Sequence, residues 1–240
     1  MKYVTLVVVI ALVSFSSCRW MGYKQIKGNG NLKTEERSVS RAEKIKLAGS
    51  YDVEITQGPV VSVKVEADEN ILPYIFTSQV DGFLLIKSKE HVSFSSDNPI
   101  KIFITTTKLE QIQLAGSGNI VGKSKFTNGD KLVIKIAGSG DMQLEVNTPE
   151  ITAEIAGSGT INLKGETKTE TIHISGVGDY NAIGLKAENA KIKIAGSGNV
   201  RVFAETNLDV NIAGVGSVYY KGGATVKQKV AGSGEVKKID

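Results

Sequence analysis

The sequence predicts an all-β fold, a parallel β-helix-like solenoid with coils of about 18–22 residues. Two observations lead to this prediction. A four-residue tag, Ala-Gly-Ser-Gly or a near copy, recurs through the last two-thirds of the chain. The segments beside each tag alternate apolar and polar residues, which is the period of a strand with one buried face. The tags start at Ala115, Ala137, Ala156, Ser175, Ala195, Ala213 and Ala231, with steps of 22, 19, 19, 20, 18 and 18 residues.

Each tag follows a strand-like segment with two apolar positions separated by a mostly polar one. The residues immediately before the tags are Leu114, Ile136, Ile155, Ile174, Ile194, Ile212 and Val230. Two positions earlier the chain has Ile112, Ile134, Ala153, Ile172, Ile192 and Val210, and the last repeat breaks the pattern with Gln228. Because successive strand residues point to opposite faces, both sets are predicted to face the core as ladders of Ile, Val and Leu.

The tag itself is predicted to be a sharp corner between two strands. Its two glycines can take positive φ, and its alanine is small enough for neighbouring backbones to pack closely. A second alternating segment follows, as in residues 142–146 and 200–202. The tag serines are expected to form an outer column, interrupted by Val177 and Val215. An antiparallel meander of hairpins also fits strand-turn-strand units, although near-identical corners and a regular period favour parallel coils.

Residues 1–18 have the pattern of a lipoprotein signal peptide. Lys2 gives a short basic start, residues 4–15 are mostly apolar, and small residues precede Cys18, the only cysteine in the chain. The apolar run is too short for a comfortable membrane-spanning helix. Phe15 stands where a lipobox usually has leucine, so an ordinary signal peptide with an incidental cysteine is the alternative.

Lipidation of Cys18 would anchor the mature protein stably in a membrane. Two or three acyl chains give stable membrane binding, whereas a single chain binds only weakly and reversibly. Residues 19–36 are then predicted to be a polar tether. We expect a protein secreted across the inner membrane and lipid-anchored to the outer membrane, on its periplasmic side or on the cell surface. The lipid membrane is therefore the first expected partner.

Residues 37–110 are predicted to be an N-terminal β region that caps the repeats of residues 111–240, the two forming one continuous domain. A degenerate tag starts at Ala48, with Tyr51 in place of the second glycine, and the next tag starts 67 residues later. This part of the chain therefore carries an insertion or a differently wound first unit. Covering one end of a solenoid protects its open strand edges from aggregation.

The chain resembles the DUF2807 family, the auto-transporter adhesin head (GIN) domain that is common in Bacteroidetes. The resemblance is carried by a lipoprotein-like start, by the segments AGSYDVEITQG, VSVKVEADENILPYI and GFLLIKS, and by serial AGSGN and AGSGD corners. It covers about residues 37–235. It implies a right-handed β-helix-like domain on a secreted or lipid-anchored protein with an adhesive role, and it offers no catalytic residues to carry over.

The remaining residues give little support for catalysis. Asp141 and Asp179 both follow a tag, but such residues are also common turn formers, and a paired-acid glycosidase needs a cleft. His91 and His173 have no sequence neighbours that suggest a triad or a metal cluster. Aspartate follows too few tags for a calcium-binding roll. We expect no catalytic residue, no metal and no cofactor.

Net charge is +4, from 29 basic and 25 acidic residues that are spread evenly, and no basic cluster has interleaved aromatics. Nucleic-acid binding is therefore not expected. Tyr180, Tyr219 and Tyr220 are the candidate binding residues, since exposed aromatic rings can stack on sugars. The leading hypothesis is a non-enzymatic envelope lipoprotein that binds glycan or protein partners through its strand faces. The alternatives are a carbohydrate-active enzyme on a β-helix and a structural protein that forms a homo-oligomer.

Overall fold

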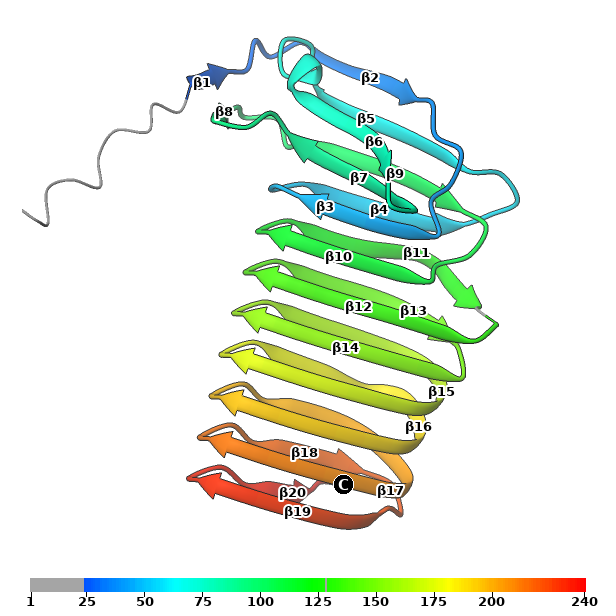
Figure 1. The fold of residues 1–240 in the computed structure, drawn as a ribbon, viewed down its shortest axis with the longest axis vertical. Helices are drawn as coiled ribbons and strands as arrows, with labels where there is room; N and C mark the ends of the chain where they lie inside the picture. Colours follow the sequence, from blue (N-terminus) through cyan, green and yellow to red (C-terminus); the bar gives the residue numbers. More distant parts are fainter. Residues whose placement is uncertain (1–23, 128) are drawn as a thin grey trace, which may run out of the picture.

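The computed structural model describes residues 24–127 and 129–240, and Figure 1 shows them as a tall stack of parallel coils. Cys18 and the signal segment lie outside the described residues. The parallel solenoid predicted from the repeats is confirmed, and the antiparallel meander is not found in the repeats. Among the described residues, no helix has the length and hydropathy to cross a membrane.

One side of the stack is formed by the strands that lead into the tags, and we call it the pre-tag sheet. Each strand pairs in parallel with the strand of the next coil, so that Ala115 lies beside Ala137 and Ile134 beside Ala153. Its strands are β3 (Lys44–Ala48), β10 (Gln111–Gly116), β12 (Lys131–Gly138), β14 (Glu150–Gly157), the later halves of β15 (Thr160–Gly176), β16 (Asp179–Gly196) and β17 (Val200–Gly214), and β19 (Thr225–Gly232).

The other side, the post-tag sheet, is formed by the strands that leave the tags. It contains β4 (Asp52–Gln57), β11 (Asn119–Thr127), β13 (Asp141–Asn147), the earlier halves of β15, β16 and β17, β18 (Val218–Lys221) and β20 (Val236–Lys238). The three long strands β15 to β17 bend around the corner opposite the tags and so belong to both sheets.

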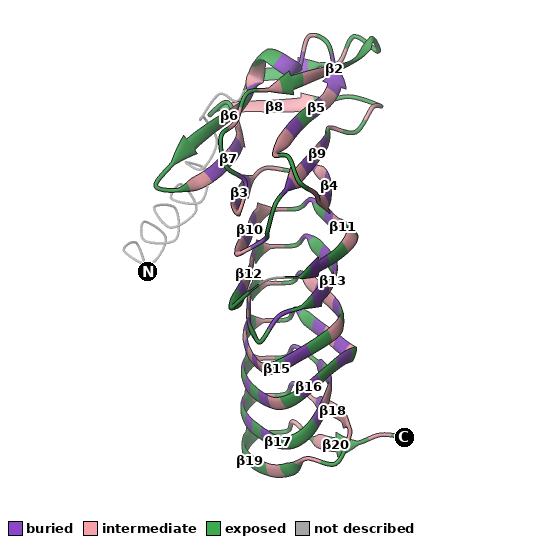
Figure 2. Cartoon of the chain, turned by 90° about the vertical axis from the view of Figure 1, so that its right-hand side faces the viewer, coloured by how far each residue is buried: buried purple, intermediate pink, exposed green. Residues whose placement is uncertain are grey.

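The core lies between the two sheets as ladders of aliphatic side chains. The alternation predicted from the sequence gives an alternating burial pattern along every central strand, visible as colour bands in Figure 2. Ile112, Ile134, Ile172 and Ile192 are fully buried in one such ladder. In the last coil Gln228 takes this inward position and is exposed, because no further coil covers it.

The tags form the corners, and their two glycines are required for different reasons, one for its backbone conformation and one for space. The first glycine of each tag has a positive φ, 131° at Gly176, and a side-chain Cβ there would overlap the carbonyl oxygen of Gly157 in the preceding coil. The second glycine, such as Gly178, does not use the positive φ that is open to it. It is needed for space, since a Cβ would overlap Gly159 and the side chain of Ile155.

The N-terminal end is covered by a cap, drawn at the top of Figure 1. The first coil, β3 and β4, stacks in register on β10 and β11, so the degenerate tag at Ala48 is a true corner. The other cap strands are β5 (Ser62–Asp68), β6 (Ile75–Val80), β7 (Phe83–Ser88), β8 (Val92–Ser95) and β9 (Lys101–Thr106), and η1 (Leu72–Tyr74) is a short 3-10 turn. Antiparallel pairs β5–β9 and β6–β7 end the parallel stack here.

Two strands lie in the predicted tether, so that prediction was wrong for residues 24–27 and 32–36. β1 (Lys24–Lys27) pairs with β8, and β2 (Leu32–Arg37) pairs antiparallel with β5. The segment is too polar to reveal a strand by alternation. Its partner supplies backbone hydrogen bonds, and Lys64 forms an ion pair with Glu36 at 2.9 Å, so a polar edge strand is stable there.

Candidate binding surface

Two outward columns of mostly polar side chains run along the post-tag sheet, with one residue from each coil. The first column is Asn119, Asp141, Thr160, Asp179, Asn199, Ser217 and Glu235, and the second is Val121, Gln143, Asn162, Asn181, Arg201, Tyr219 and Lys237. Parallel in-register pairing places like positions of successive coils side by side, about 4.8 Å apart. The sheet therefore presents a continuous polar face.

The acids of the first column hold neighbouring coils together. Asp141 Oδ1 accepts a hydrogen bond from the backbone N–H of Thr160 at 3.2 Å. Asp179 Oδ1 accepts from the backbone N–H and from Nδ2 of Asn199, at 2.9 and 3.2 Å. Both carboxylates therefore have structural partners of the kind expected of turn-forming residues, and Thr160 stands between them in the column.

The second column has one unused acceptor and one aromatic ring. Asn181 donates from Nδ2 to Asn162 Oδ1 at 3.3 Å, while its own Oδ1 is buried and has no hydrogen-bond partner. In the next coils the Arg201 guanidinium lies 5.9 Å from the centre of the Tyr219 ring. The Tyr219 hydroxyl donates to Glu235 Oε1 at 3.0 Å, which fixes the ring against the sheet.

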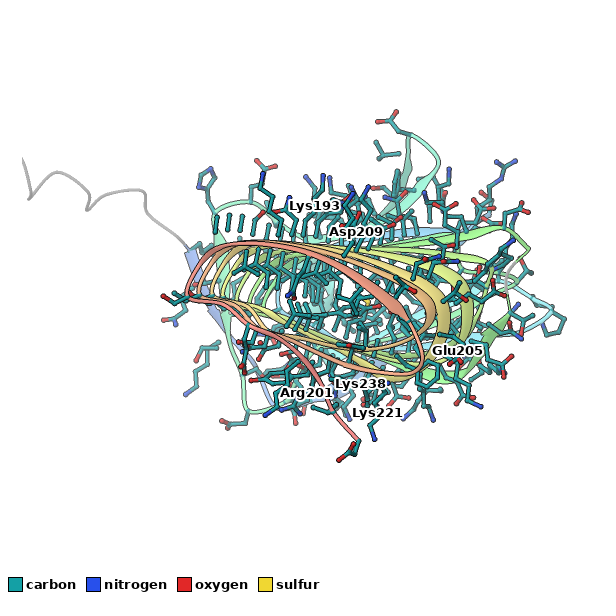
Figure 3. All side chains as sticks on the ribbon, turned by 90° about the horizontal axis from the view of Figure 1, so that it is seen from below. Lys193, Arg201, Glu205, Asp209, Lys221 and Lys238 are labelled. Atoms are coloured by element: carbon teal, nitrogen blue, oxygen red, sulfur yellow. The ribbon has the colours of Figure 1, made fainter. Side chains whose placement is uncertain are left out.

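These side chains line a shallow hollow of about 390 Å³ on the polar face. Amide groups offer both donors and acceptors, a guanidinium offers donors in a fixed plane, and a tyrosine ring offers an apolar surface. Their combination suits a ligand that has several hydroxyl groups and an apolar ring face. Figure 3 shows Arg201 on this broad side of the flattened coil, with Lys193 and Asp209 on the opposite side.

The structure separates the three candidate tyrosines. Tyr219 is partly exposed on the outer face, and Tyr220 packs partly buried against the core, as expected for adjacent residues of one strand. Tyr180 is only 1% exposed, so its prediction as a binding residue was wrong. It occupies an inward position beside Ile161 and Val200, and its ring is part of the core.

The Tyr180 hydroxyl reaches a buried carboxyl that the sequence analysis missed. It donates to Glu170 Oε2 at 2.8 Å, and Glu170 Oε1 has no partner. Burial raises the pKa of Glu170 to about 8, so the carboxyl is largely protonated at neutral pH. Burial also raises the pKa of Tyr180, and Glu170 adds to that rise. The pair is fully enclosed and therefore belongs to the core rather than to a site.

A sequence signal for Glu170 does exist. It stands in register between Ile151 and Ala190, in an inward column where the other residues are apolar. A charged residue in such a column predicts either a partner or a neutral carboxyl. The register alone does not identify Tyr180 as that partner. In β16 the residue paired with Glu170 is Ala190, and Tyr180 lies ten residues earlier in the same strand.

The two histidines stay apart from each other and from the acids of the polar face. His91 lies in the cap with φ of 58°, and His173 lies on the pre-tag sheet between Glu154 and Lys193. Within residues 24–127 and 129–240, no group of three His, Cys, Asp or Glu side chains is placed to hold a metal ion.

The sequence matches the DUF2807 family, described as "Putative auto-transporter adhesin, head GIN domain", over residues 42–224. The chain belongs to this family. The match begins near the first coil and ends just before the last, so it spans the cap and most of the stack. No curated protein has significant similarity to the chain.

Solved structures from Bacteroides and Parabacteroides species share the architecture. A putative adhesin from Bacteroides fragilis is 25% identical, with a TM-score of 0.83, and the match covers 89% of this chain and all of that one. A putative lipid binding protein from Parabacteroides distasonis is 28% identical, with a TM-score of 0.73, covering 90% and 100%. A putative adhesin from Parabacteroides merdae is 26% identical, with a TM-score of 0.70, covering 90% and 99%.

Proposed function

We propose that this protein is a non-enzymatic cell-envelope lipoprotein whose solenoid binds an extended glycan through the polar face of the post-tag sheet. The observation that carries the proposal is the hollow in which the Arg201–Tyr219 pair lies beside Asn162 and Asn181. Membership of an adhesin head family and the likeness to proteins named as adhesins support a binding role over a catalytic one.

The ligand is a hydroxyl-rich polymer in this proposal, because the hollow repeats similar polar groups from coil to coil. A linear glycan lying across successive coils would meet Asn162, Asn181 and Arg201 in turn, and one of its rings would stack on Tyr219. Sugar C–H faces and aromatic rings associate in water for the same reason that other apolar surfaces do. A protein partner of the envelope or of a host is the alternative occupant.

A glycan array tests the binding role directly. The wild type is expected to retain a neutral glycan, and Tyr219→Ala is expected to weaken its binding by at least tenfold. Tyr74→Ala is the matched control, since Tyr74 also lies under a cation, with Lys89 Nζ 5.8 Å from its ring centre, but sits in the cap. Equal loss in both variants, or binding unaffected by Tyr219→Ala, would contradict the proposal.

The anchoring part of the proposal rests on Cys18 and the apolar run before it. Protease shaving of intact cells, with a periplasmic lipoprotein as control, decides which side of the outer membrane the solenoid faces. Cleavage of this protein while the control survives supports adhesion to other cells. Protection until the outer membrane is broken would rule out surface adhesion. Cys18→Ala is expected to release the protein from the membrane fraction, and unchanged retention would rule out the lipid anchor.

A further inference from the structure

A second surface, on the opposite side of the stack from the polar face, has the character of an anion site. In the last three coils of the pre-tag sheet, four exposed lysines surround one aspartate and one asparagine. In-register pairing forms the columns Lys191–Asp209–Lys227 and Lys193–Asn211–Lys229. We call these six residues the lysine groove.

The lysines of the groove have no ion-pair partners. Within the described residues, the ion pairs shorter than 4.0 Å all lie between Lys33 and Lys164, and Asp209 makes none with Lys191 or Lys227. The same column shows the contrast nearer the cap, where Lys135 pairs with Glu154 of the next coil at 2.8 Å. Four lysines against one aspartate leave the groove with a net charge of +3.

The surface between these side chains is hollowed rather than flat. One hollow of about 290 Å³ is lined by the lysine groove, and a second, of about 320 Å³, continues along the sheet toward His173 and shares Lys193 and Asn211 with the first. A ligand lying in the groove would therefore run along the stack axis, across successive coils.

We propose that the lysine groove binds an acidic glycan whose carboxylates are spaced widely along the polymer. Lysines of one column are two coils apart, about 10 Å. The coil between them presents Asp209 or Asn211, which can accept hydrogen bonds from sugar hydroxyls. A dense polyanion would place negative charge against Asp209. Duplex DNA is such a polymer, because it carries one charge for about every 1.7 Å of its axis.

The position of the groove along the stack argues against a membrane lipid as its ligand. It lies at the end of the stack opposite Lys24, the first described residue, as Figure 1 shows by the positions of β1 and β19. Anionic lipid headgroups of that membrane are therefore a poor match for its position. The inference does not depend on the polar face, since the two surfaces share no residue.

Titration with hyaluronate, which has one uronate in each disaccharide, tests the inference. Wild type is expected to bind hyaluronate more tightly than dextran, with affinity that falls as salt rises. Changing all four lysines to Gln should weaken hyaluronate binding by at least tenfold. Lys46→Gln is the matched control, because Lys46 is exposed in the same outward column, beside Gln113 in the first coil, and it should leave binding unchanged.

Asp209→Asn separates a spaced acidic glycan from any other polyanion. Wild type should prefer hyaluronate to a polyglutamate peptide of equal length, and Asp209→Asn should raise polyglutamate affinity by a larger factor than hyaluronate affinity. Three results would overturn the inference: no hyaluronate binding, equal binding by the four-lysine variant, or equal wild-type affinity for the two polymers. Each can occur while the Tyr219 experiment succeeds, so the two proposals fail independently.

Discussion

The two ends of the solenoid are built in opposite ways. At the N-terminal end, β7 and β9 lie on the first coil, and antiparallel strands close the stack beyond them. Tyr51 fills the corner, and its hydroxyl lies 2.8 Å from Ser88 Oγ. At the C-terminal end no described strand covers β19 and β20, and Val230 is 37% exposed. Among the described residues, strands of the chain cover the first end and none covers the second.

The two ends also differ in charge, since the C-terminal part carries an excess of basic residues. The ion pairs within the described residues lie between Lys33 and Lys164, and one of them, Lys123–Glu54 at 3.1 Å, joins the first two coils. Residues 186–240 contain nine basic and five acidic residues, so this segment alone accounts for the net charge of +4. The capped end is therefore closed by strand pairing, and the open end carries the excess positive charge of the proposed lysine groove.

The largest expected difference concerns the tag glycines. Gly176→Ala in the middle of the stack would place a Cβ against the Gly157 carbonyl at a φ of 131°, and both neighbouring coils prevent relief. We expect a loss of about 4 kcal/mol in unfolding free energy. Gly232→Ala has similar local geometry, but the last coil can shift outward, so its loss is expected to be about 1–2 kcal/mol.

Urea denaturation followed by circular dichroism measures both losses. Gly129→Ala is the control, because a Cβ there meets nothing within 4 Å. Equal losses for Gly176→Ala and Gly232→Ala would mean that the open end is as constrained as the middle, and the comparison would then be wrong.

The buried carboxyl gives the middle of the stack a pH dependence. The folded protein holds the Glu170 proton up to about pH 8, and the unfolded chain releases it near 4.5. The folded state therefore binds more protons between these values, so stability falls as pH rises from about 5 to 8, by on the order of 3 kcal/mol. Glu170→Gln should remove most of this slope in urea midpoints, and an unchanged slope would show that another group causes it.

The open end is expected to become adhesive toward other copies of the chain when its last coil is made apolar. Gln228→Ile restores the inward pattern of Ile192 and Val210 and leaves an apolar, unpaired edge. Light scattering should detect a concentration-dependent rise in mass for this variant. Val60→Ile, at a site 70% exposed near the cap, adds similar apolar surface and should remain unchanged. Identical masses for both variants would mean that the last coil is not a reactive edge.

The smallest expected effect comes from the ion pairs. Glu154→Gln removes the partner of Lys135, and both side chains are about 40% exposed, at 42% and 38%. The loss in stability should therefore be below about 1 kcal/mol and should shrink further in high salt. Thermal denaturation at low and high salt measures this loss. A loss well above about 1 kcal/mol would show that the exposed ion pairs contribute substantially to stability, contrary to this expectation.

The repeat made most of the stack predictable from sequence. A tag at nearly constant spacing, with Ile or Val at fixed positions before it, specifies both the corner and the inward face, and residues such as Ile134 and Ile172 lie where that pattern places them.

What could not be predicted depends on contacts between distant parts of the chain. β2 is a strand because β5 pairs with it, and nothing in its own polar sequence requires that. Tyr180 lies in the alternating segment after a tag. The sequence did not show that its ring is buried and that its hydroxyl contacts Glu170. Lys193 likewise lacks an ion pair because its neighbour in the next coil is Asn211. The corresponding neighbour of Lys135 is Glu154, which does form an ion pair.

Hydrogen exchange of the whole protein with and without hyaluronate tests most directly whether partners bind at the open end. The account predicts slower exchange in residues 186–232 of the pre-tag sheet when the glycan is bound, and no change in the cap strands of residues 24–110. Protection confined to the cap, or spread evenly over the stack, would contradict the claim that the uncovered, unpaired end of this solenoid is its binding end.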